Sequence, residues 1–223
     1  GVTLAVETTG TIKDREGLAQ HLACGAKKVV ISAPGKDVDA MIVMGVNHAT
    51  YDGAQHNIIS AASCTTNCLA PAVKVLHETF GFRHGLMTTI HSYTMSQRIL
   101  DGTHKDWRRG RAAAVSMVPS STGDAKAVGQ VMPELEGKLN GMSVRVPTFD
   151  CSLVDLTCEV EKACDAAAVN AALQAASKGA LAENMGYSEE PLVSIDYKGS
   201  TFGGVVDALS TQVLDGTMVK LLI

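Results

Sequence analysis

Four apolar runs in the first 62 residues show little alternation between hydrophobic and polar positions. They are Val2–Val6, Lys28–Ser32, Met41–Gly45 and Asn57–Ala62. Runs of this kind predict strands that are buried on both faces, as in parallel sheets. Between the first two runs, Asp14 is suited to cap a helix that ends at Gly25. We therefore expect a strand, helix and strand unit in a parallel sheet covered on both faces.

The second part of the chain has longer predicted strands and hairpins. We expect strands at Gly85–His91, Gly141–Val146, Ser152–Val160, Val205–Leu214 and Met218–Ile223, and helices at Cys64–Phe80, Gly123–Leu139 and Ala166–Lys178. Asp215 and Gly216 separate the last two strands, and this dipeptide is typical of tight hairpin turns. The pattern predicts an α/β chain of two domains: residues 1–63 hold the parallel sheet, and residues 64–223 form an α+β domain with a largely antiparallel or mixed sheet.

Composition narrows the class of protein. The chain has 223 residues, of which 46% are hydrophobic and 19% charged, so it can bury one large core or two small ones. The net charge of −4 gives no overall basic field of the kind that attracts nucleic acid or anionic membranes. No run reaches transmembrane length, and no signal-peptide pattern opens the chain. We expect a soluble globular protein without nucleic-acid or membrane partners.

The six cysteines do not form a disulfide framework or a metal site in this interpretation. A chain of this length and apolar content needs no disulfides, so we expect reduced thiols and an intracellular protein. Cys64 and Cys68 are spaced by one helical turn, unlike the paired cysteines of a zinc knuckle. The pair His21 and Cys24 is isolated. The basic cluster Lys105–Arg111 is interpreted as a solvated or subunit-facing loop.

Cys64 is the candidate nucleophile. It stands at the predicted start of a helix, where unpaired backbone N–H groups and the positive end of the helix dipole favour a thiolate. Free cysteines are usually buried and structural, and spacing alone favours that reading. His91 favours the nucleophilic role of Cys64 over the structural one, because it ends a predicted strand, the usual position for a base that serves a cysteine. Whether the two side chains meet is decided by the fold.

The residues around Cys64 and His91 resemble a known family. Ala62-Ser-Cys-Thr-Thr-Asn-Cys-Leu-Ala-Pro71 and His91-Ser-Tyr-Thr94 are similar to the active-site signature of glyceraldehyde-3-phosphate dehydrogenases. Further similar stretches follow in the same order, among them Pro119-Ser-Ser-Thr-Gly123, Arg145-Val-Pro-Thr148, Tyr187-Ser-Glu-Glu-Pro-Leu-Val193 and Asp207-Ala-Leu-Ser210. The resemblance covers essentially the whole chain. It implies the C-terminal part of a Rossmann-like sheet followed by the catalytic domain of this family.

The resemblance implies a phosphorylating oxidation of D-glyceraldehyde 3-phosphate to 1,3-bisphosphoglycerate. Cys64 would attack the aldehyde carbon, His91 would take the proton, and inorganic phosphate would release the resulting thioester. Two phosphate sites are implied: Thr94 and Arg145 for the substrate phosphate, and Ser63, Thr65, Thr122 and Gly123 for the attacking phosphate. Independently of the family, Arg145 lies between apolar residues of a strand, where either a salt bridge or an anionic ligand would compensate its charge.

The implied cofactor is NAD, and NADP is not excluded. Thr9 and Ser32 follow two strands of the predicted parallel sheet and would lie along the dinucleotide. No GxGxxG motif occurs in the chain, although the family has this turn near its N-terminus. Since the chain opens inside a strand without Met, we expect a fragment of a longer protein, inactive alone. The resemblance further implies a cytoplasmic homotetramer.

Several residues depart from the family pattern. Met95 and Ser96 follow Thr94 where a small residue or Asn, then Asp, is usual, and Asp124 replaces a usual alanine beside Gly123. Asp150 and Cys151 replace an Asn-Val pair. Two alternatives therefore stay open: erythrose-4-phosphate dehydrogenase, which has the same cysteine chemistry, and a non-catalytic binding or scaffold relative. The pair of Cys64 and His91 favours an enzyme.

Overall fold

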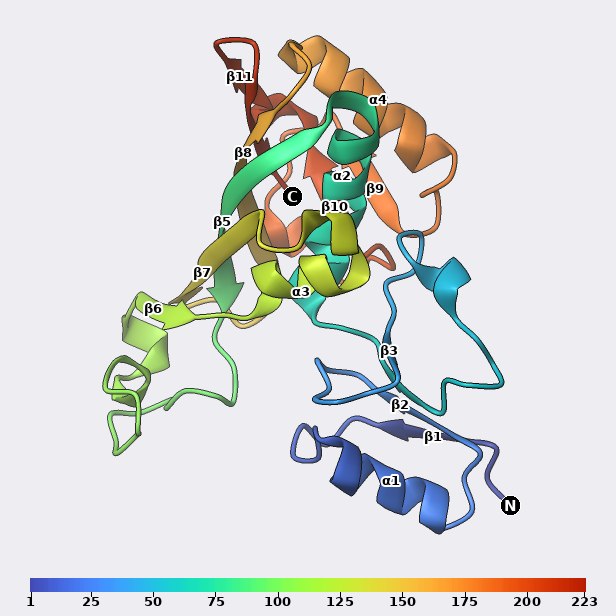
Figure 1. Ribbon diagram of the computed structural model, residues 1–223. Coiled ribbons are helices and arrows are strands. Elements are labelled where there is room, and N and C mark those ends of the chain that lie inside the picture. The colour runs from blue at the N-terminus through green and yellow to red at the C-terminus, as the bar shows by residue number, and fades with distance from the viewer.

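The computed structural model describes residues 1–223 and contains a parallel sheet, a larger mixed sheet and one short two-stranded sheet (Figure 1). The parallel sheet has the order β1-β2-β4-β3. Its strands are β1 (Leu4–Glu7), β2 (Lys28–Ile31), β3 (Ala40–Met41) and β4 (Ile58–Ser60). The predicted parallel sheet is confirmed.

Helix α1 (Arg15–Ala23) covers one face of this sheet. The Asp14 carboxylate accepts a hydrogen bond from Gly17 N at 2.9 Å, so the predicted helix cap is present. The core between helix and sheet is small and consists of four buried residues, Leu18, Val29, Ile31 and Ile58. On the other face of β1, Leu4 and Val6 are 49% and 59% exposed. The prediction that both faces are covered is therefore wrong at β1.

The strand predicted at Met41–Gly45 is also wrong beyond Met41. The Asn47 side chain accepts from Val43 N at 2.8 Å and donates to Met41 O at 2.8 Å. These backbone groups are thus paired with a side chain instead of a neighbouring strand, and Gly45 turns the chain at φ +78°. A short 3₁₀ helix, His48–Thr50, follows.

The mixed sheet has the order β11-β12-β8-β5-β7-β6. Its strands are β5 (Phe82–Ser92), β6 (Val118–Ser121), β7 (Leu139–Val146), β8 (Ser152–Val160), β11 (Gln212–Leu214) and β12 (Met218–Leu222). Only β5 and β7 are parallel neighbours. The predicted mixed sheet is confirmed, and β6 was not predicted. Asp215 and Gly216 join the last two strands with φ of 50° and 73°, as the predicted hairpin turn requires.

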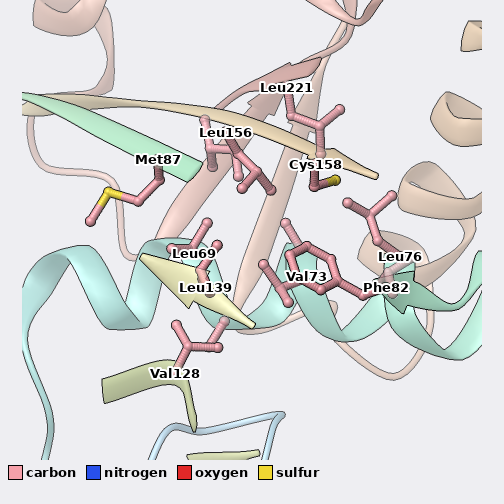
Figure 2. Packing of buried hydrophobic residues seen from close by; sticks show 14 of the residues in the cluster. Leu69, Val73, Leu76, Phe82, Met87, Val128, Leu139, Leu156, Cys158 and Leu221 are labelled. Atoms are coloured by element: carbon pink, nitrogen blue, oxygen red, sulfur yellow. The ribbon is translucent and has the colours of Figure 1, made fainter. Parts of the chain in front are cut away.

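Helix α2 (Cys64–Phe80) packs along this sheet and organises the main core of 29 buried residues. Figure 2 shows the α2 side chains facing the sheet side chains of Leu156, Cys158 and Leu221. The α2 residues in this contact are Leu69, Val73 and Leu76. The helix ends at Gly81, whose φ of +76° suits glycine, as predicted.

Helix α3 (Asp124–Val131) is shorter than predicted. Pro133 has no N–H to continue the helical hydrogen bonds, so a 3₁₀ turn, Pro133–Leu135, follows instead. Gly137 then reverses the chain at φ +76°, and Leu139 already begins β7. The prediction of one helix over Gly123–Leu139 is therefore wrong past Val131.

The strand predicted at Val205–Leu214 is divided in two. Strand β10 (Gly204–Asp207) pairs in parallel with β9 (Met185–Ser188), and a 3₁₀ helix, Ala208–Ser210, separates it from β11. The Asp207 carboxylate starts this helix by accepting from Leu209 N at 3.1 Å and from Ser210 Oγ at 2.6 Å.

Helix α4 (Ala166–Lys178) begins after Asp165, as predicted. The Asp165 carboxylate caps the helix by accepting from Ala168 N at 2.7 Å. None of the helices combines the length and apolar character that crossing a membrane would require.

Candidate active site

Cys64 is the first residue of α2 and is exposed. Between β4 and α2 the chain turns at Ala62, which is buried and adopts a left-handed φ of +59°. The Ser63 hydroxyl accepts a hydrogen bond from Thr66 N at 3.0 Å and caps the helix. The Cys64 sulfur is therefore held at the helix N-terminus, where unpaired N–H groups favour negative charge.

His91 lies near the end of β5, and its ring reaches Cys64. His91 Nε2 is 3.5 Å from Cys64 Sγ, and His91 Nδ1 is 2.7 Å from the Ser92 carbonyl oxygen. A carbonyl oxygen only accepts hydrogen bonds, so we place the imidazole proton on Nδ1. Nε2 then presents its lone pair to the thiol. This is the geometry of a base that takes the Cys64 proton.

The surroundings of His91 favour its neutral form. Burial lowers the pKa of His91 below its ordinary value, and the positive charge of Arg145 lowers it further. The hydrogen bond to Ser92 O and the negative charge of Asp124 raise the His91 pKa in the opposite direction. The net effect is a lowered pKa, so His91 is a neutral acceptor for a thiol proton near neutral pH.

Arg145 lies beside His91 because the two residues pair in register between β5 and β7. Its Nη1 atom lies 3.0 Å from His91 Nδ1 and donates to Ser92 O and Thr94 Oγ1, each at 3.3 Å. No hydrogen bond is made by Arg145 Nε or Nη2. No carboxylate forms a salt bridge with Arg145. A half-buried guanidinium with unused donors is suited to bind an anion.

The residues predicted for the attacking phosphate lie at the N-termini of α2 and α3. Ser63 and the buried Thr65 belong to the start of α2, and Thr122 and Gly123 precede α3. Thr66 links the two helix starts by donating from Oγ1 to Asp124 O at 3.4 Å. Gly123, directly before α3, supplies no side-chain cap, and Thr122 Oγ1 accepts a hydrogen bond from Asp124 N at 3.2 Å. Two helix N-termini linked in this way favour a bound anion.

Arg109 was not among the residues predicted for the site. It lies in the basic cluster Lys105–Arg111, which sequence reasoning assigned to a solvated or subunit-facing loop. In the structure Arg109 contacts the mixed sheet: its Nη2 atom donates to the carbonyl oxygen of Ser121, at the end of β6, at 3.1 Å. Burial lowers the pKa of Arg145, and after burial the Arg109 charge is the largest cause of that lowering. Arg109 therefore adds positive charge near Arg145.

A cleft of about 550 Å³ opens at the reactive pair. Cys64, Thr65, His91 and Thr94 line it, together with apolar residues such as Phe149 and Phe202. The other residues predicted to bind phosphate do not line this cleft; they are Ser63, Thr122, Gly123 and Arg145. Arg145 meets the cleft through its contact with His91, and Ser63 directly precedes Cys64 in the chain. The structure thus brings Cys64, His91, Thr94 and Arg145 together, and Thr66 links the start of α2 to the start of α3.

Thr9 and Ser32 lie at a different place, at the carboxyl ends of β1 and β2. Both are exposed, and Gly10 next to Thr9 turns the chain at φ +74°. Polar groups beyond the carboxyl ends of parallel strands form the usual ligand-binding edge of such sheets. Because exposed hydroxyls and a glycine turn allow close approach of a ligand, these residues fit part of a dinucleotide.

The thiol one turn after Cys64 differs from it. Burial, with a smaller effect from the Cys64 charge, raises the pKa of the Cys68 thiol to about 12. All six cysteines are free in the structure. No group of three or more His, Cys, Asp or Glu side chains is arranged to hold a metal ion. Of the two thiols in the signature, only Cys64 is exposed and lies within reach of His91.

Comparison with known proteins agrees with the geometry. Residues 63–223 match the family model described as "Glyceraldehyde 3-phosphate dehydrogenase, C-terminal domain". The chain is 61% identical over 220 residues to the glyceraldehyde-3-phosphate dehydrogenase of Geobacillus stearothermophilus, covering 99% of this chain and 66% of that protein. It is 59% identical over 222 residues to glyceraldehyde-3-phosphate dehydrogenase 1 of Bacillus cereus, covering 100% of this chain and 66% of that protein.

More distant relatives show the same coverage. Glyceraldehyde-3-phosphate dehydrogenase 2 of a Nostoc species is 53% identical over 221 residues, which are 99% of this chain and 66% of that protein. The chain thus spans just under two thirds of the length of these relatives. Because the family model covers most of the chain and the identities extend over nearly all of it, the chain belongs to the glyceraldehyde 3-phosphate dehydrogenase family.

Proposed function

We propose that the protein carrying this chain oxidises D-glyceraldehyde 3-phosphate to 1,3-bisphosphoglycerate, as a step of glycolysis and gluconeogenesis. The observation that supports this function best is the 3.5 Å contact between Cys64 Sγ and His91 Nε2. A thiol nucleophile with a base, next to an arginine with unused donors, suits oxidation of an aldehyde that bears a phosphate. The names of the relatives point to the same substrate.

The first chemical step joins Cys64 to the substrate. His91 Nε2 takes the thiol proton, and the Cys64 thiolate attacks the aldehyde carbon to form a hemithioacetal. The Cys64 backbone N–H and the protonated His91 ring are suited to stabilise the oxyanion that develops. The oxyanion takes this proton from His91 and becomes the hemithioacetal hydroxyl, and neutral His91 then accepts the hydroxyl proton as the hemithioacetal loses a hydride and becomes a thioester. A bound dinucleotide, NAD or NADP, would supply the hydride acceptor.

The second chemical step releases the product. An oxygen of inorganic phosphate attacks the thioester carbon, the C–S bond breaks, and Cys64 leaves as a thiolate. Sulfur suits both steps because a thiolate is a good nucleophile and a good leaving group. Arg145 and Thr94 are proposed to hold the substrate phosphate, whereas the attacking phosphate is assigned to Ser63, Thr65, Thr122 and Gly123.

The residues proposed for cofactor binding are Thr9 and Ser32. They support binding of one part of the dinucleotide at the edge of the parallel sheet. This chain contains no glycine-rich turn of the GxGxxG type, so its residues support no choice between NAD and NADP.

Assembly and location belong to the same proposal. Exposed apolar side chains gather on the segment 95–117, which projects beyond β6 in Figure 1. They are Met95, Ile99, Leu100, Trp107, Val115 and Met117. An apolar loop of this extent is suited to a contact between subunits. We propose a homotetramer in the cytoplasm, where the free thiols would stay reduced.

Formation of reduced cofactor by the intact protein tests this function. We expect turnover with glyceraldehyde 3-phosphate that requires inorganic phosphate and is abolished by Cys64→Ala. A higher kcat/KM for erythrose 4-phosphate would favour the alternative dehydrogenase. Absence of turnover with both aldehydes, in a protein that folds and binds the dinucleotide, would favour the non-catalytic relative.

A further inference from the structure

Glu7 is the only acidic side chain among the buried residues of the chain, with 4% exposure. It ends β1, at the edge where Thr9 and Ser32 are proposed to meet the dinucleotide. A buried carboxylate is costly unless it is paired and hydrogen-bonded. Its position therefore requires specific partners, and no step of the proposed reaction uses it.

The partners of Glu7 come from the following turn and from α1. Thr9 donates to Glu7 Oε1 through its backbone N–H at 2.7 Å and through its hydroxyl at 2.5 Å. His21 Nε2 lies 3.2 Å from Glu7 Oε2. These hydrogen bonds, first that of the Thr9 hydroxyl, hold the pKa of Glu7 below its usual range. The carboxylate is therefore ionised and fully engaged at neutral pH.

The Thr9 hydroxyl is fixed by these contacts. Because its proton goes to Glu7, Thr9 Oγ1 acts as acceptor for Thr11 Oγ1 at 2.7 Å and for Thr11 N at 3.3 Å. Glu7 thus anchors a short chain of hydrogen bonds that spans the turn around Gly10. A turn that contains a glycine with positive φ gains order from such an anchor.

Glu7 also contacts the second residue proposed for the cofactor. Its backbone carbonyl accepts from Ser32 N at 3.1 Å, directly after β2. One residue therefore holds Thr9 through its side chain and Ser32 through its main chain. The partner His21, which appeared isolated in the sequence, adds a group from α1 to the same cluster.

We propose that Glu7 is a positioning residue that fixes the Thr9–Thr11 turn for the nicotinamide dinucleotide. It acts through Thr9 and need not touch the ligand itself. The anchored turn would bind the dinucleotide without first losing conformational freedom, so Glu7 contributes to affinity and not to the chemical step. This inference rests on the proposed function, because that function supplies the ligand.

The test compares Glu7→Gln with Glu16→Gln in the intact protein. Glu16 is exposed on α1 and serves as a matched control. By calorimetry with NAD, or with NADP if that is the dinucleotide bound, we expect Glu7→Gln to raise Kd about tenfold or more. We expect kcat at saturating dinucleotide to stay within about twofold, because the Cys64 and His91 pair is unaltered. Glu16→Gln should change neither quantity.

Variants of Thr9 test the same anchor from the exposed side of the turn, where folding is not at risk. Thr9→Ser keeps the hydroxyl and should keep the affinity, whereas Thr9→Val should weaken it. The double variant Glu7→Gln/Thr9→Val should bind no more weakly than the worse single variant, because both changes remove one contact. If Glu7→Gln is too unstable to assay, His21→Ala, which removes the partner of Glu7 Oε2 without changing Thr9, takes its place and should also raise Kd.

Several outcomes would overturn the inference. They are an unchanged Kd in Glu7→Gln, equal affinities of Thr9→Val and Thr9→Ser, fully additive losses in the double variant, or a fall in kcat as large as the rise in Kd. A wild-type protein that binds neither dinucleotide would contradict the proposed function itself. The two kinds of failure are therefore distinguishable.

Discussion

The edge formed by the start of α2 and the ends of β5 and β7 differs from the end of β1 in whether its polar groups are free to meet a ligand. At the first edge, Cys64 at the start of α2 is exposed, and Arg145 of β7 keeps two nitrogens without hydrogen bonds. At β1, Glu7 is buried, and both of its carboxylate oxygens are engaged. The first edge is therefore suited to react with a ligand, and the second to hold a conformation.

The two edges are also supported by hydrophobic cores of different size. The mixed sheet is supported by 29 buried residues and the parallel sheet by four. A large core can keep a half-buried arginine and a left-handed Ala62 in place. A small core cannot hold a turn rigid by packing, so hydrogen bonds such as those of Glu7 have to do so. Changes at the first edge should alter the reaction with the aldehyde and with phosphate, and changes at the second should alter affinity for the dinucleotide.

The largest expected effect concerns the reactivity of the two thiols of α2. Near neutral pH, Cys64 should react with iodoacetamide at least about a thousandfold faster than Cys68, because a pKa of about 12 leaves almost no Cys68 thiolate. Peptide mapping of the labelled intact protein measures both rates. Cys64→Ala should remove the fast phase and Cys68→Ala should keep it. Faster labelling of Cys68 or Cys151 would show that the nucleophile is wrongly assigned.

The second largest effect is expected when the proposed base, His91, is replaced. His91→Asn should slow oxidation of the aldehyde by roughly a hundredfold or more, because the thiol loses its proton acceptor. Affinity for the dinucleotide should stay within a few-fold, which is the reverse of the effect expected for Glu7→Gln. Single-turnover kinetics and calorimetry separate the two quantities. His84→Asn, on an exposed position of the same strand, is the control. Unchanged single-turnover rates in His91→Asn would exclude this role.

Smaller effects are expected from variants that each change one of the two proposed phosphate sites. Arg145→Leu should lower kcat/KM for the phosphorylated aldehyde by roughly tenfold to a hundredfold, as expected for lost charged hydrogen bonds. Thr122→Val should chiefly raise the KM for inorganic phosphate. The exposed Arg83 provides a control, Arg83→Leu, in the same sheet. If both variants weaken both ligands equally, the division of the sites is wrong.

The smallest effect should appear in the pH dependence. The neutral form of His91 is the active one, so kcat/KM should fall as the pH drops through the His91 pKa. Since that pKa is lowered, the acidic limb should lie below about 6.5, the ordinary histidine value. The Asp124 charge raises the His91 pKa, so Asp124→Ala should move the limb to still lower pH.

The control for this shift is Lys126→Ala, an exposed change on the same helix, which should leave the limb in place. Asp124→Ala should also lower the KM for phosphate, since it removes a negative charge from the α3 N-terminus. A limb that moves to higher pH would contradict the electrostatic argument.

Local signals in the sequence predicted many element boundaries. Asp14, Ser63 and Asp165 begin helices because their side-chain oxygens accept hydrogen bonds from the first turn. Asp215 and Gly216 form the predicted hairpin turn because both adopt positive φ. The failures were local as well: the side chains of Asn47 and Asp207 take over backbone hydrogen bonds, and alternation of apolar residues does not reveal this.

By itself, the sequence determined the family, the mixed α/β class and the identity of the candidate nucleophile, because these depend on short motifs and apolar periodicity. Tertiary structure alone decided which residues meet. The register of β5 against β7 places Arg145 beside His91, and packing of α1 brings His21 to Glu7. Such contacts join residues 54 and 14 positions apart. They depend on the order of strands and on burial, which no local pattern specifies.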